Sequence, residues 1–465
     1  MVLERAASVA NIAMLRANDL PSQIQIEKIE ELTTLLYLEL DTLTSDDTSP
    51  ETRNRILAQL DINRSIVAPI RRLPKELLID IFFLLAYESP LRTLHVAATI
   101  ARVCIVWRDI AHGLTDFWTK AVVNSARDLK GYCELFLPLT EEKLSDLRCD
   151  NREALGSLWD YIEPHASRWR RITLGARLSE IPDLKVIYME RLERLIVDAY
   201  DTPVSAELSA LDFVVAPNLR HIGLTIDVLQ SERQLHIPAM RALTSLTVEA
   251  MESFPATRVL PLLRECAQTL QFLTLKIRHP SDRPEGSSPT SASNIFRMTA
   301  LSELRVNDSA CALLNYIIAP FIIELILSTV PAKGSQWLLG FLTRNQESRH
   351  LLGFRVYQTE ERDISAWIPC LELIPSVIDL HFDELLSNED FLKLLIRHAD
   401  IPPILPSLKR IAIANIYKKH KELQQLIREM CKSRAKVTTY QGRLAVMTLS
   451  WFVERMGPEW VGREL

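Results

Sequence analysis

Few residues in this 465-residue chain stand at spacings that support covalent chemistry. The 12 glycines occur singly, so the chain has neither a phosphate-binding loop nor a dinucleotide-binding fingerprint. The ten histidines include no pair at metal-binding helical spacing, and no serine lies in a nucleophile elbow. The seven cysteines have no close partner in sequence, which argues against a zinc site or a disulfide framework. The sequence therefore predicts a chain without enzymatic activity, catalytic residue, metal or cofactor.

Two pairs of carboxylates are the nearest candidates for a catalytic acid and base. Glu141 and Glu142 form one pair, and Asp46 and Asp47 form the other. Catalytic carboxylates need environments that push their pKa values apart. Both pairs lie in polar stretches of sequence, so we expect them to be solvated surface.

Basic side chains gather at Arg168–Arg171 and at Lys418–Lys421. Trp169, inside the first cluster, would suit stacking on a nucleic acid base, but its place in a repeat described below favours packing in a core. The net charge of −5 gives no reason to expect nucleic acid or an anionic membrane as a ligand. We interpret both clusters as solvated surface.

The composition is that of a folded soluble protein, with 48% hydrophobic and 24% charged residues. No apolar run approaches the ~20 residues that span a bilayer. Residues 1–20 lack the charged and then apolar pattern of a signal peptide, and the scattered cysteines fit a reducing compartment. We therefore expect an intracellular protein of the cytoplasm or nucleus, without a membrane partner.

The elements that would position a site begin with two amphipathic helices. From residue 22 to residue 43, apolar side chains recur every three or four positions, and residues 50–67 repeat the pattern. A polar link separates the two stretches, and Pro50 suits the start of the second helix. Residues 1–67 are therefore predicted to form a helical hairpin or a short coiled coil.

A compact three-helix unit is predicted next. Pro69 ends the preceding helix, and Pro74 suits the first turn of a new one. Two further helices are predicted near residues 94–100 and 103–111. The first helix of the unit carries more apolar residues than one core requires, so it is predicted to pack on two sides. Those residues are Leu77, Leu78, Ile81, Phe82 and Leu85.

The same stretch resembles the F-box motif. It has the leucine and proline start of that motif at Leu73 and Pro74, and its cysteine and tryptophan at Cys104 and Trp107. The matching positions are Leu73, Pro74, Glu76, Leu78, Ile81, Phe82, Val103, Cys104, Trp107, Arg108, Ile110, Ala111 and Trp118.

The flanks of the motif, Ala68–Arg72 and Ser167–Arg170, are similar to those of F-box proteins of mushroom-forming fungi. In one departure, Ile105 and Val106 stand where the family usually has polar residues. Their apolar side chains suggest packing against the N-terminal hairpin.

The resemblance implies a substrate-recognition adaptor of an SCF-type ubiquitin ligase. In such an adaptor an F-box domain, here residues 68–118, docks on a Skp1-like adaptor and through it on cullin, and the subunit contributes proximity but no covalent step. The residues that the resemblance assigns to the Skp1 face are Leu73, Pro74, Leu77, Leu78, Ile81, Phe82, Val103, Cys104 and Trp107. Some of them, Trp107 above all, could instead fill the core of the unit. An alternative for the whole protein is a Skp1-binding scaffold that acts outside a ubiquitin ligase.

The rest of the chain repeats one template, in which an apolar residue is followed by further apolar residues three and five positions later. Its copies start at Trp169, Leu192, Leu219, Leu243, Leu270, Leu301, Ile322, Leu351, Val377 and Leu408. The starts are 21 to 31 residues apart, close to the ~20 to 29 residues of leucine-rich repeats, whose units combine a strand with a helix. Weaker copies are expected at Trp118 and, with Leu135 and Leu137, at Tyr132.

The last two apolar positions of each copy would alternate along a strand and point inward, so that stacked copies share one core. We therefore predict an α/β fold in which a helical hairpin and a trihelical F-box precede a curved leucine-rich-repeat solenoid. The repeats would cover residues 119–434, and a C-terminal cap would cover residues 435–465.

Residues on the outward strand positions are candidates for binding a protein target, because their mixed charges suit a protein partner. They are Lys276, Arg305, Arg355, Tyr357, His381 and Asp383. The sequence does not identify the target.

Overall fold

The computed structural model describes residues 2–17, 20–43, 50–88, 93–149, 155–177, 186–200, 214–226, 242–250, 256–277, 295–346, 350–360, 363–382, 389–397, 403–413, 421–434, 436–440, 443–447 and 450–452. The chain divides into two compact units, Met1–Arg148 and Cys149–Leu465. Residues 119–148, predicted as the start of the repeats, belong to the first unit.

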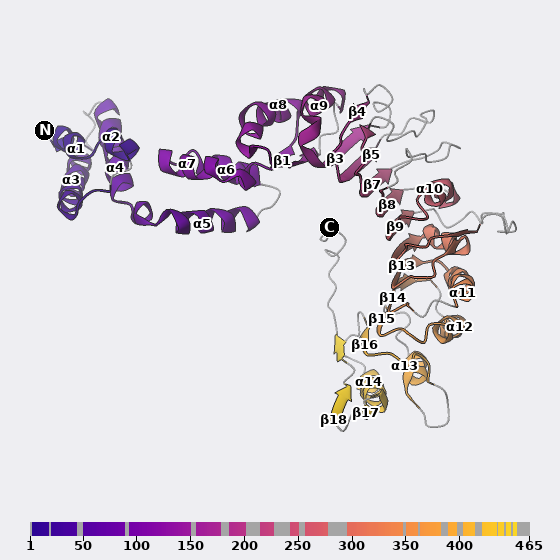
Figure 1. The fold of residues 1–465 in the computed structure, drawn as a ribbon. Coiled ribbons are helices and arrows are strands. Elements are labelled where there is room, and N and C mark those ends of the chain that lie inside the picture. The colour runs from indigo at the N-terminus through magenta and orange to yellow at the C-terminus, as the bar shows by residue number, and fades with distance from the viewer. Residues whose placement is uncertain are drawn as a thin grey trace. The chain divides into compact units, whose positions relative to one another are not determined.

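The first unit opens with a group of four helices among its described residues (Figure 1). They are α1 (Val2–Val9), α2 (Ile12–Ala17), α3 (Gln23–Thr42) and α4 (Pro50–Val67). At the start of α3 the Ser22 hydroxyl accepts a hydrogen bond from the Gln25 amide, and the Gln25 side chain accepts one from the Ser22 amide. This reciprocal capping satisfies two amides that a helix start leaves without partners.

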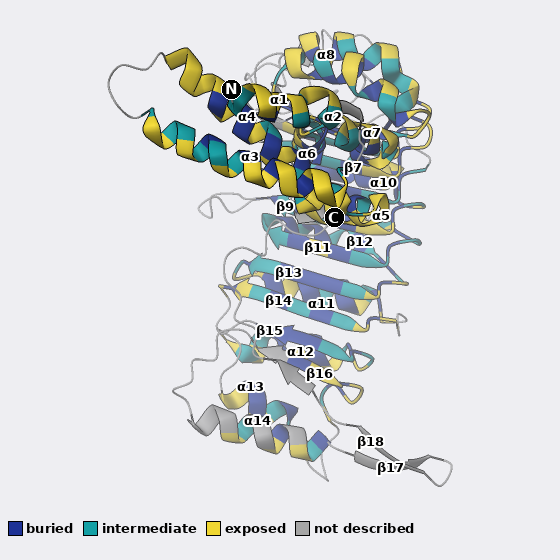
Figure 2. Ribbon diagram, turned by 90° about the vertical axis from the view of Figure 1, so that its left-hand side faces the viewer, coloured by how far each residue is buried: buried dark blue, intermediate teal, exposed yellow. Residues whose placement is uncertain are grey.

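The apolar stripe of α3 is covered within the chain, because α3 packs on α4 and both contact α1. Buried and exposed residues follow one another around α3 (Figure 2). The predicted helical hairpin is confirmed. The sequence interpretation missed α1 and α2, whose Ala6 and Ala10 are buried against α3 and α4.

The three-helix unit also forms as predicted, with α5 (Lys75–Glu88), α6 (Thr93–Ile100) and α7 (Ile105–Gly113) after a short 3-10 turn, η1 (Pro69–Arg72). The helices share one core. Helix α7 begins two residues later than predicted, because Cys104 caps it and its Sγ accepts a hydrogen bond from the Trp107 amide at 3.5 Å. Val106 packs against this core, contrary to the expectation that it contacts the N-terminal hairpin, and Ile105 is 38% exposed.

The last part of the first unit contains η3 (Thr115–Phe117), β1 (Lys120–Val123), α8 (Ala126–Leu135), η4 (Leu137–Thr140) and β2 (Ser145–Cys149). The strand expected at Tyr132 is wrong, because Tyr132 lies in α8 and its hydroxyl donates to the Trp118 carbonyl at 2.6 Å. Strand β2 follows β1 in the sheet instead. Leu147 and Cys149 are buried on β2 and, with Leu144 before them, have the template spacing that could have revealed this strand.

The second unit is built around a parallel sheet whose strands follow one another in chain order. These strands are β3 (Trp169–Arg177), β5 (Arg194–Tyr200), β7 (His221–Ile226), β8 (Ser245–Ala250), β9 (Phe272–Ile277), β11 (Glu303–Asp308), β13 (Glu324–Val330), β14 (Gly353–Thr359), β15 (Asp379–Phe382), β16 (Arg410–Ile413) and β19 (Ser450–Phe452). Each of the ten strong template copies supplies one of the strands β3 to β16, so these strand predictions are confirmed.

Equivalent template positions lie side by side in the sheet. Leu304 of β11 aligns with Leu273 of β9 and with Leu325 of β13, and the same register continues through Phe354 and Leu380. All five side chains are buried. A continuous apolar layer therefore forms from residues that the template aligns.

The links between strands differ along the second unit. Helices α10 (Leu260–Glu265), α11 (Gly334–Arg344), α12 (Ile368–Glu372) and α13 (Glu389–Leu395) lie along one side of the later strands (Figure 1). Elsewhere the described links contain the paired short strands β4 (Ile187–Tyr188) and β6 (Val214–Val215), and β10 (Phe296–Arg297) and β12 (Ile317–Ile318). The described links therefore do not contain a helix in every repeat, as the leucine-rich-repeat template had predicted.

Further elements complete the second unit. They are α9 (Leu155–Ile162), η5 (Glu163–Arg168), η7 (Ala256–Val259), η9 (Ser309–Asn315), η10 (Ile364–Ala366), α14 (Lys421–Arg434), β17 (Lys436–Tyr440) and β18 (Arg443–Met447). Among the described residues, no helix combines the length and the apolar character needed to cross a membrane. The chain is thus a mixed helix and strand protein with helices at its N-terminus.

Candidate functional site

Helix α5 has two apolar faces. Leu78, Phe82 and Ala86 are buried in the core of the three-helix unit. Leu77, Ile81, Leu84 and Leu85 lie on the other face and are 48%, 37%, 66% and 45% exposed. We name these four residues the α5 stripe. Their spacing of four, three and one places them on one face of the helix, where they offer a continuous apolar surface to a partner.

The structure separates the residues predicted for the Skp1 face by their burial. Pro74, Leu77, Ile81 and Val103 are exposed, whereas Leu78 and Phe82 are core residues, with 4% and 0% exposure. The prediction missed Leu84, although it stands three residues after Ile81.

The remaining three predicted residues, Leu73, Cys104 and Trp107, are half-buried. Trp107 contacts Phe82 edge to face, with ring centroids 4.9 Å apart. Leu73 and Trp107 both pack against the core of the unit. Trp107 packs against the core and Cys104 caps α7, and part of each side chain remains at the surface.

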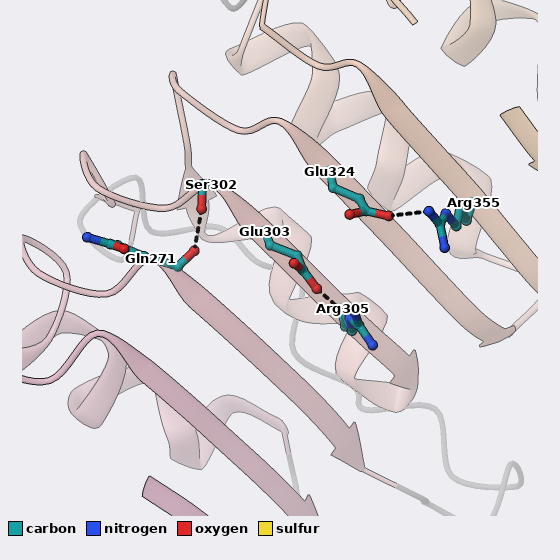
Figure 3. A network of polar contacts seen from close by, with 6 residues as sticks. All are labelled: Gln271, Ser302, Glu303, Arg305, Glu324 and Arg355. Carbon is teal, nitrogen blue, oxygen red and sulfur yellow. Dashed lines mark hydrogen bonds and ion pairs between the residues drawn. The ribbon is translucent and has the colours of Figure 1, made fainter. Parts of the chain in front are cut away.

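A second candidate surface is the outward face of the sheet, which we define as the side opposite the buried template residues. Carboxylates and arginines on its later strands pair with one another (Figure 3). Glu303 pairs with Arg305 on β11, Glu324 of β13 pairs with Arg355 of β14 at 3.0 Å, and Asp379 of β15 pairs with Arg410 of β16 at 3.1 Å. We name these six residues the ion-pair ladder.

A glycine makes room for one pair of the ladder. Gly353 lies in register with Glu324 and with Asp379, and a Cβ atom at Gly353 would come within 3.3 Å of the Glu324 Cγ. The lack of a side chain at Gly353 therefore leaves space for Glu324 to reach Arg355 on the same strand. Burial lowers the pKa of the Arg355 guanidinium, but Glu324, with Tyr357 and Asp379, raises it above its ordinary value.

The residues predicted to bind a target have different surroundings on this face. Arg305 and Arg355 are held in the ladder, and Lys276 pairs with Glu249. Tyr357 and His381 contact each other, with ring centroids 4.5 Å apart. His381 is only 6% exposed, so the expectation that this outward position is open to a partner is wrong. Asp383, like Asp46 and Asp47, lies outside the described residues.

The early strands carry positive charge on the same face. Arg171, Arg194 and His221 lie in register on β3, β5 and β7. The sequence interpretation had treated Arg171 as solvated surface and missed its two partners in register, although each stands two residues after a template start. Trp169 is buried, and its indole nitrogen donates to the Ile162 carbonyl at 3.1 Å, so core packing is confirmed for this residue.

The described residues offer little that resembles a catalytic or metal site. Glu141 and Glu142 are exposed, as expected of solvated surface. Burial raises the pKa of the Cys133 and Cys266 thiols to about 11 and that of Cys370 to about 12, which disfavours the reactive thiolate. Within the described ranges no group of three His, Cys, Asp or Glu side chains is placed to hold a metal ion.

Comparison with known proteins adds no relative. No model of a known protein family matches this chain, and a search of curated proteins finds no match. The described geometry defines a mixed helix and strand protein with two candidate interaction surfaces, the α5 stripe and the outward face of the sheet.

Proposed function

We propose that this chain is a non-catalytic substrate-recognition subunit of an SCF-type ubiquitin ligase. In this proposal the three-helix unit is an F-box domain that binds a Skp1-like adaptor and through it cullin. The α5 stripe is the observation that carries it, because four large apolar residues on one face of a helix are costly to expose and suit a helical partner.

The sheet unit takes the second role in this proposal, as a leucine-rich-repeat solenoid that holds a protein target. Support comes from the ten aligned template copies, from the chain-order parallel sheet, and from the polar character of its outward face. The subunit would raise the local concentration of the target near the ubiquitin-conjugating enzyme, which needs no catalytic side chain of its own.

The test is co-purification of a Skp1-like protein with variants of the α5 stripe. Replacing Leu77 and Ile81 together by alanine should reduce co-purification at least tenfold, because truncating central apolar anchors costs ~2 kcal/mol or more of binding. Leu38, which is 58% exposed on α3, offers a matched control, and Leu38→Ala should leave the captured amount unchanged.

A folded Leu77→Ala, Ile81→Ala protein that still captures the adaptor would disprove this contact face. Leu73→Ala with Pro74→Ala is a second pair from the predicted face and should act in the same direction. Neddylated cullin in the same purification would distinguish a ligase subunit from a Skp1-binding scaffold, since the scaffold would capture the adaptor without cullin.

A further inference from the structure

The alternation of buried and outward residues breaks at the same point in three neighbouring strands. In β8 and β9 the alternation continues to the end of the strand, where Ala250 and Ile277 are buried. The residues at the equivalent position, seven after the template start, are Asp308 on β11, Thr329 on β13 and Gln358 on β14. None of the three is buried, since the first two are half-buried and Gln358 is exposed.

A positive backbone φ accompanies each break. The φ angles of Asp308, Thr329 and Gln358 are 57°, 48° and 51°. This region favours glycine, and a β-branched residue such as threonine is an outlier there. On β13 and β14 the next residues, Val330 and Thr359, take the inward position with 0% and 3% exposure. The positive φ therefore turns a polar side chain out of the apolar layer, as a β-bulge does.

The three residues lie on adjacent strands at one level of the sheet. Ser328 of β13 lies in register with Asn307 of β11 and with Tyr357 of β14, and each of these is directly followed by a residue with positive φ. The Thr329 hydroxyl donates to the Gln358 side-chain oxygen at 3.5 Å. We name the three positive-φ residues the turned row: Asp308, Thr329 and Gln358.

The strand ends do not require these residue types. Glycine adopts a positive φ without steric cost, so glycine at the three positions would allow the same turn with less strain. Strain that persists in other residues is typical of binding sites and active sites, where the side chain is needed. The described strands β8 and β9 lack the feature, whereas three adjacent strands share it. This pattern indicates a common use for the three side chains.

The turned row and the residues before it carry mostly neutral hydrogen-bonding groups. The neutral members are Asn307, Ser328, Thr329, Tyr357 and Gln358. Their amides and hydroxyls both donate and accept. On the same strands, the charges of the ion-pair ladder cancel in pairs. A polypeptide main chain in extended form matches such a surface, because it presents a donor and an acceptor at every residue and carries no charge.

We propose that the turned row binds the main chain of an extended segment of the protein target, laid across β11, β13 and β14. Two strand spacings of ~4.8 Å give a span of ~10 Å, which an extended chain covers with about three residues. The inference rests on the proposed recognition role of the sheet unit, but it does not depend on the α5 stripe.

The probe is a displayed library of random linear peptides, selected on the full chain. Enriched peptides are synthesised, and their binding is measured by fluorescence anisotropy. Methylation of the central backbone amides of such a peptide should weaken binding at least about tenfold, because it removes main-chain donors. Raising the salt concentration from ~0.05 M to ~0.5 M should change the affinity less than about twofold, since the contacts are uncharged.

Two threonine variants separate binding from folding. Thr329→Gly should weaken peptide binding about fivefold, the value of one neutral hydrogen bond. Its melting temperature should be unchanged or higher, because glycine relieves the strain. Thr274→Gly is the matched control, at a half-buried outward position of β9 without a positive φ. It should lower the melting temperature, because glycine weakens a regular strand, and leave peptide binding within about twofold.

A double variant, Thr329→Gly with Gln358→Gly, should lose peptide binding at least about tenfold. Selection of no peptide whose binding depends on these two residues would overturn the proposal, and so would a lower melting temperature of Thr329→Gly with unchanged binding. Neutral hydrogen-bonding groups also suit sugars, so a glycan array bound by the parent protein and not by the double variant would overturn the choice of a polypeptide.

Capture of the Skp1-like adaptor by the double variant should equal that by the parent protein. Failure of the peptide experiment therefore leaves the F-box proposal standing. Loss of the F-box proposal would likewise leave peptide binding by the turned row to be decided by the anisotropy measurements.

Discussion

A single buried arginine joins three segments near the C-terminal end of the sheet. Arg434 is 5% exposed, and its guanidinium donates to the Leu395 carbonyl at 2.7 Å, to the Leu405 carbonyl at 2.7 Å and to the Ile404 carbonyl at 2.6 Å. Burial lowers its pKa to about 10, with Arg397 adding to the effect, so it stays charged at neutral pH. The guanidinium fork satisfies three carbonyls at once, which an ammonium group on a flexible stem does less well.

Arg434→Gln should therefore destabilise the second unit by about 2 to 3 kcal/mol, because carbonyls that were bound to a charged donor lose it. Chemical denaturation of the full chain measures the effect. Lys432→Gln, at an exposed position on the same helix, is the control and should change stability by less than about 0.5 kcal/mol. Similar behaviour of the two variants would contradict the role given to Arg434.

A separate prediction concerns how His221 makes the stability of the protein depend on pH. Burial first, and then Arg194 and Arg171, lower its pKa below the ordinary value of about 6.5. The unfolded chain then binds the proton more readily than the folded chain, so the contribution of this group to stability is full above pH ~6.5 and is lost as the pH falls below it.

His221→Gln cannot take up this proton. From pH 7.5 to pH 5.5 the melting temperature of the parent protein should fall further than that of the variant. His165, whose pKa burial also lowers, is present in both proteins, so the difference between the two curves isolates His221. Parallel curves would show that burial and the neighbouring arginines do not resist protonation of this histidine.

At the scale of elements, a buried polar chain sets how the N-terminal helices meet. The Gln59 side chain of α4 donates to the Ala10 carbonyl at 2.7 Å and to Asn63 at 2.9 Å, and Asn63 donates to the Thr33 hydroxyl of α3 at 2.9 Å. Apolar contacts alone would tolerate sliding of one helix along another, whereas these bonds are satisfied in one register.

Asn63→Ala should lower the free energy of unfolding of the first unit by about 1 to 3 kcal/mol, because it takes a buried partner from Gln59 and from Thr33. Thermal denaturation followed by circular dichroism tests this. Gln23→Ala, on the exposed surface of α3, is the comparison and should have little effect. An Asn63→Ala protein as stable as the parent would show that the polar chain is dispensable.

Elements with a long regular pattern were predictable, and short or irregular ones were not. The template, with apolar residues three and five positions after its start, located the strands from β3 to β16. It could do so because the buried residues of each strand come from one short stretch of sequence. Helices α1 and α2, of 8 and 6 residues, are too short to show a clear period. The sequence analysis missed strand β2, because a cysteine, Cys149, takes the last buried position of its template copy.

The candidate surfaces were harder to predict than the elements. The sequence analysis assigned both Leu77 and Leu78 to the predicted Skp1 face. Only packing against α6 and α7 separates Leu77, which is exposed, from Leu78, which is buried. His381 points outward as predicted of its strand position, yet Tyr357 from the neighbouring strand covers it. The alignment of Arg171, Arg194 and His221 follows from the register of three strands, whose template starts lie 23 and 27 residues apart.

At the scale of the whole molecule, the chain-order sheet makes each strand of the second unit depend on its immediate neighbours. Phe382 of β15 shows this most clearly, since its ring contacts Phe354 of β14, Trp367 before α12 and Phe391 of α13, with centroids 5.9, 6.3 and 4.9 Å apart. Among the described strands, β15 pairs with β14 and β16. Loss of this ring should therefore weaken the sheet locally.

Phe382→Ala should cost about 3 to 5 kcal/mol, because it opens a cavity among buried aromatic side chains. Hydrogen exchange of the full chain should then show faster exchange in β14, β15 and β16, with β3 to β8 changing little, because stability in a stacked array is transmitted between neighbours and fades with distance. Leu246→Ala on β8 provides the matched case and should reverse the pattern, with faster exchange in β7, β8 and β9. A uniform rise in exchange across the sheet for both variants would contradict this local coupling and would mean that the second unit unfolds as one cooperative block.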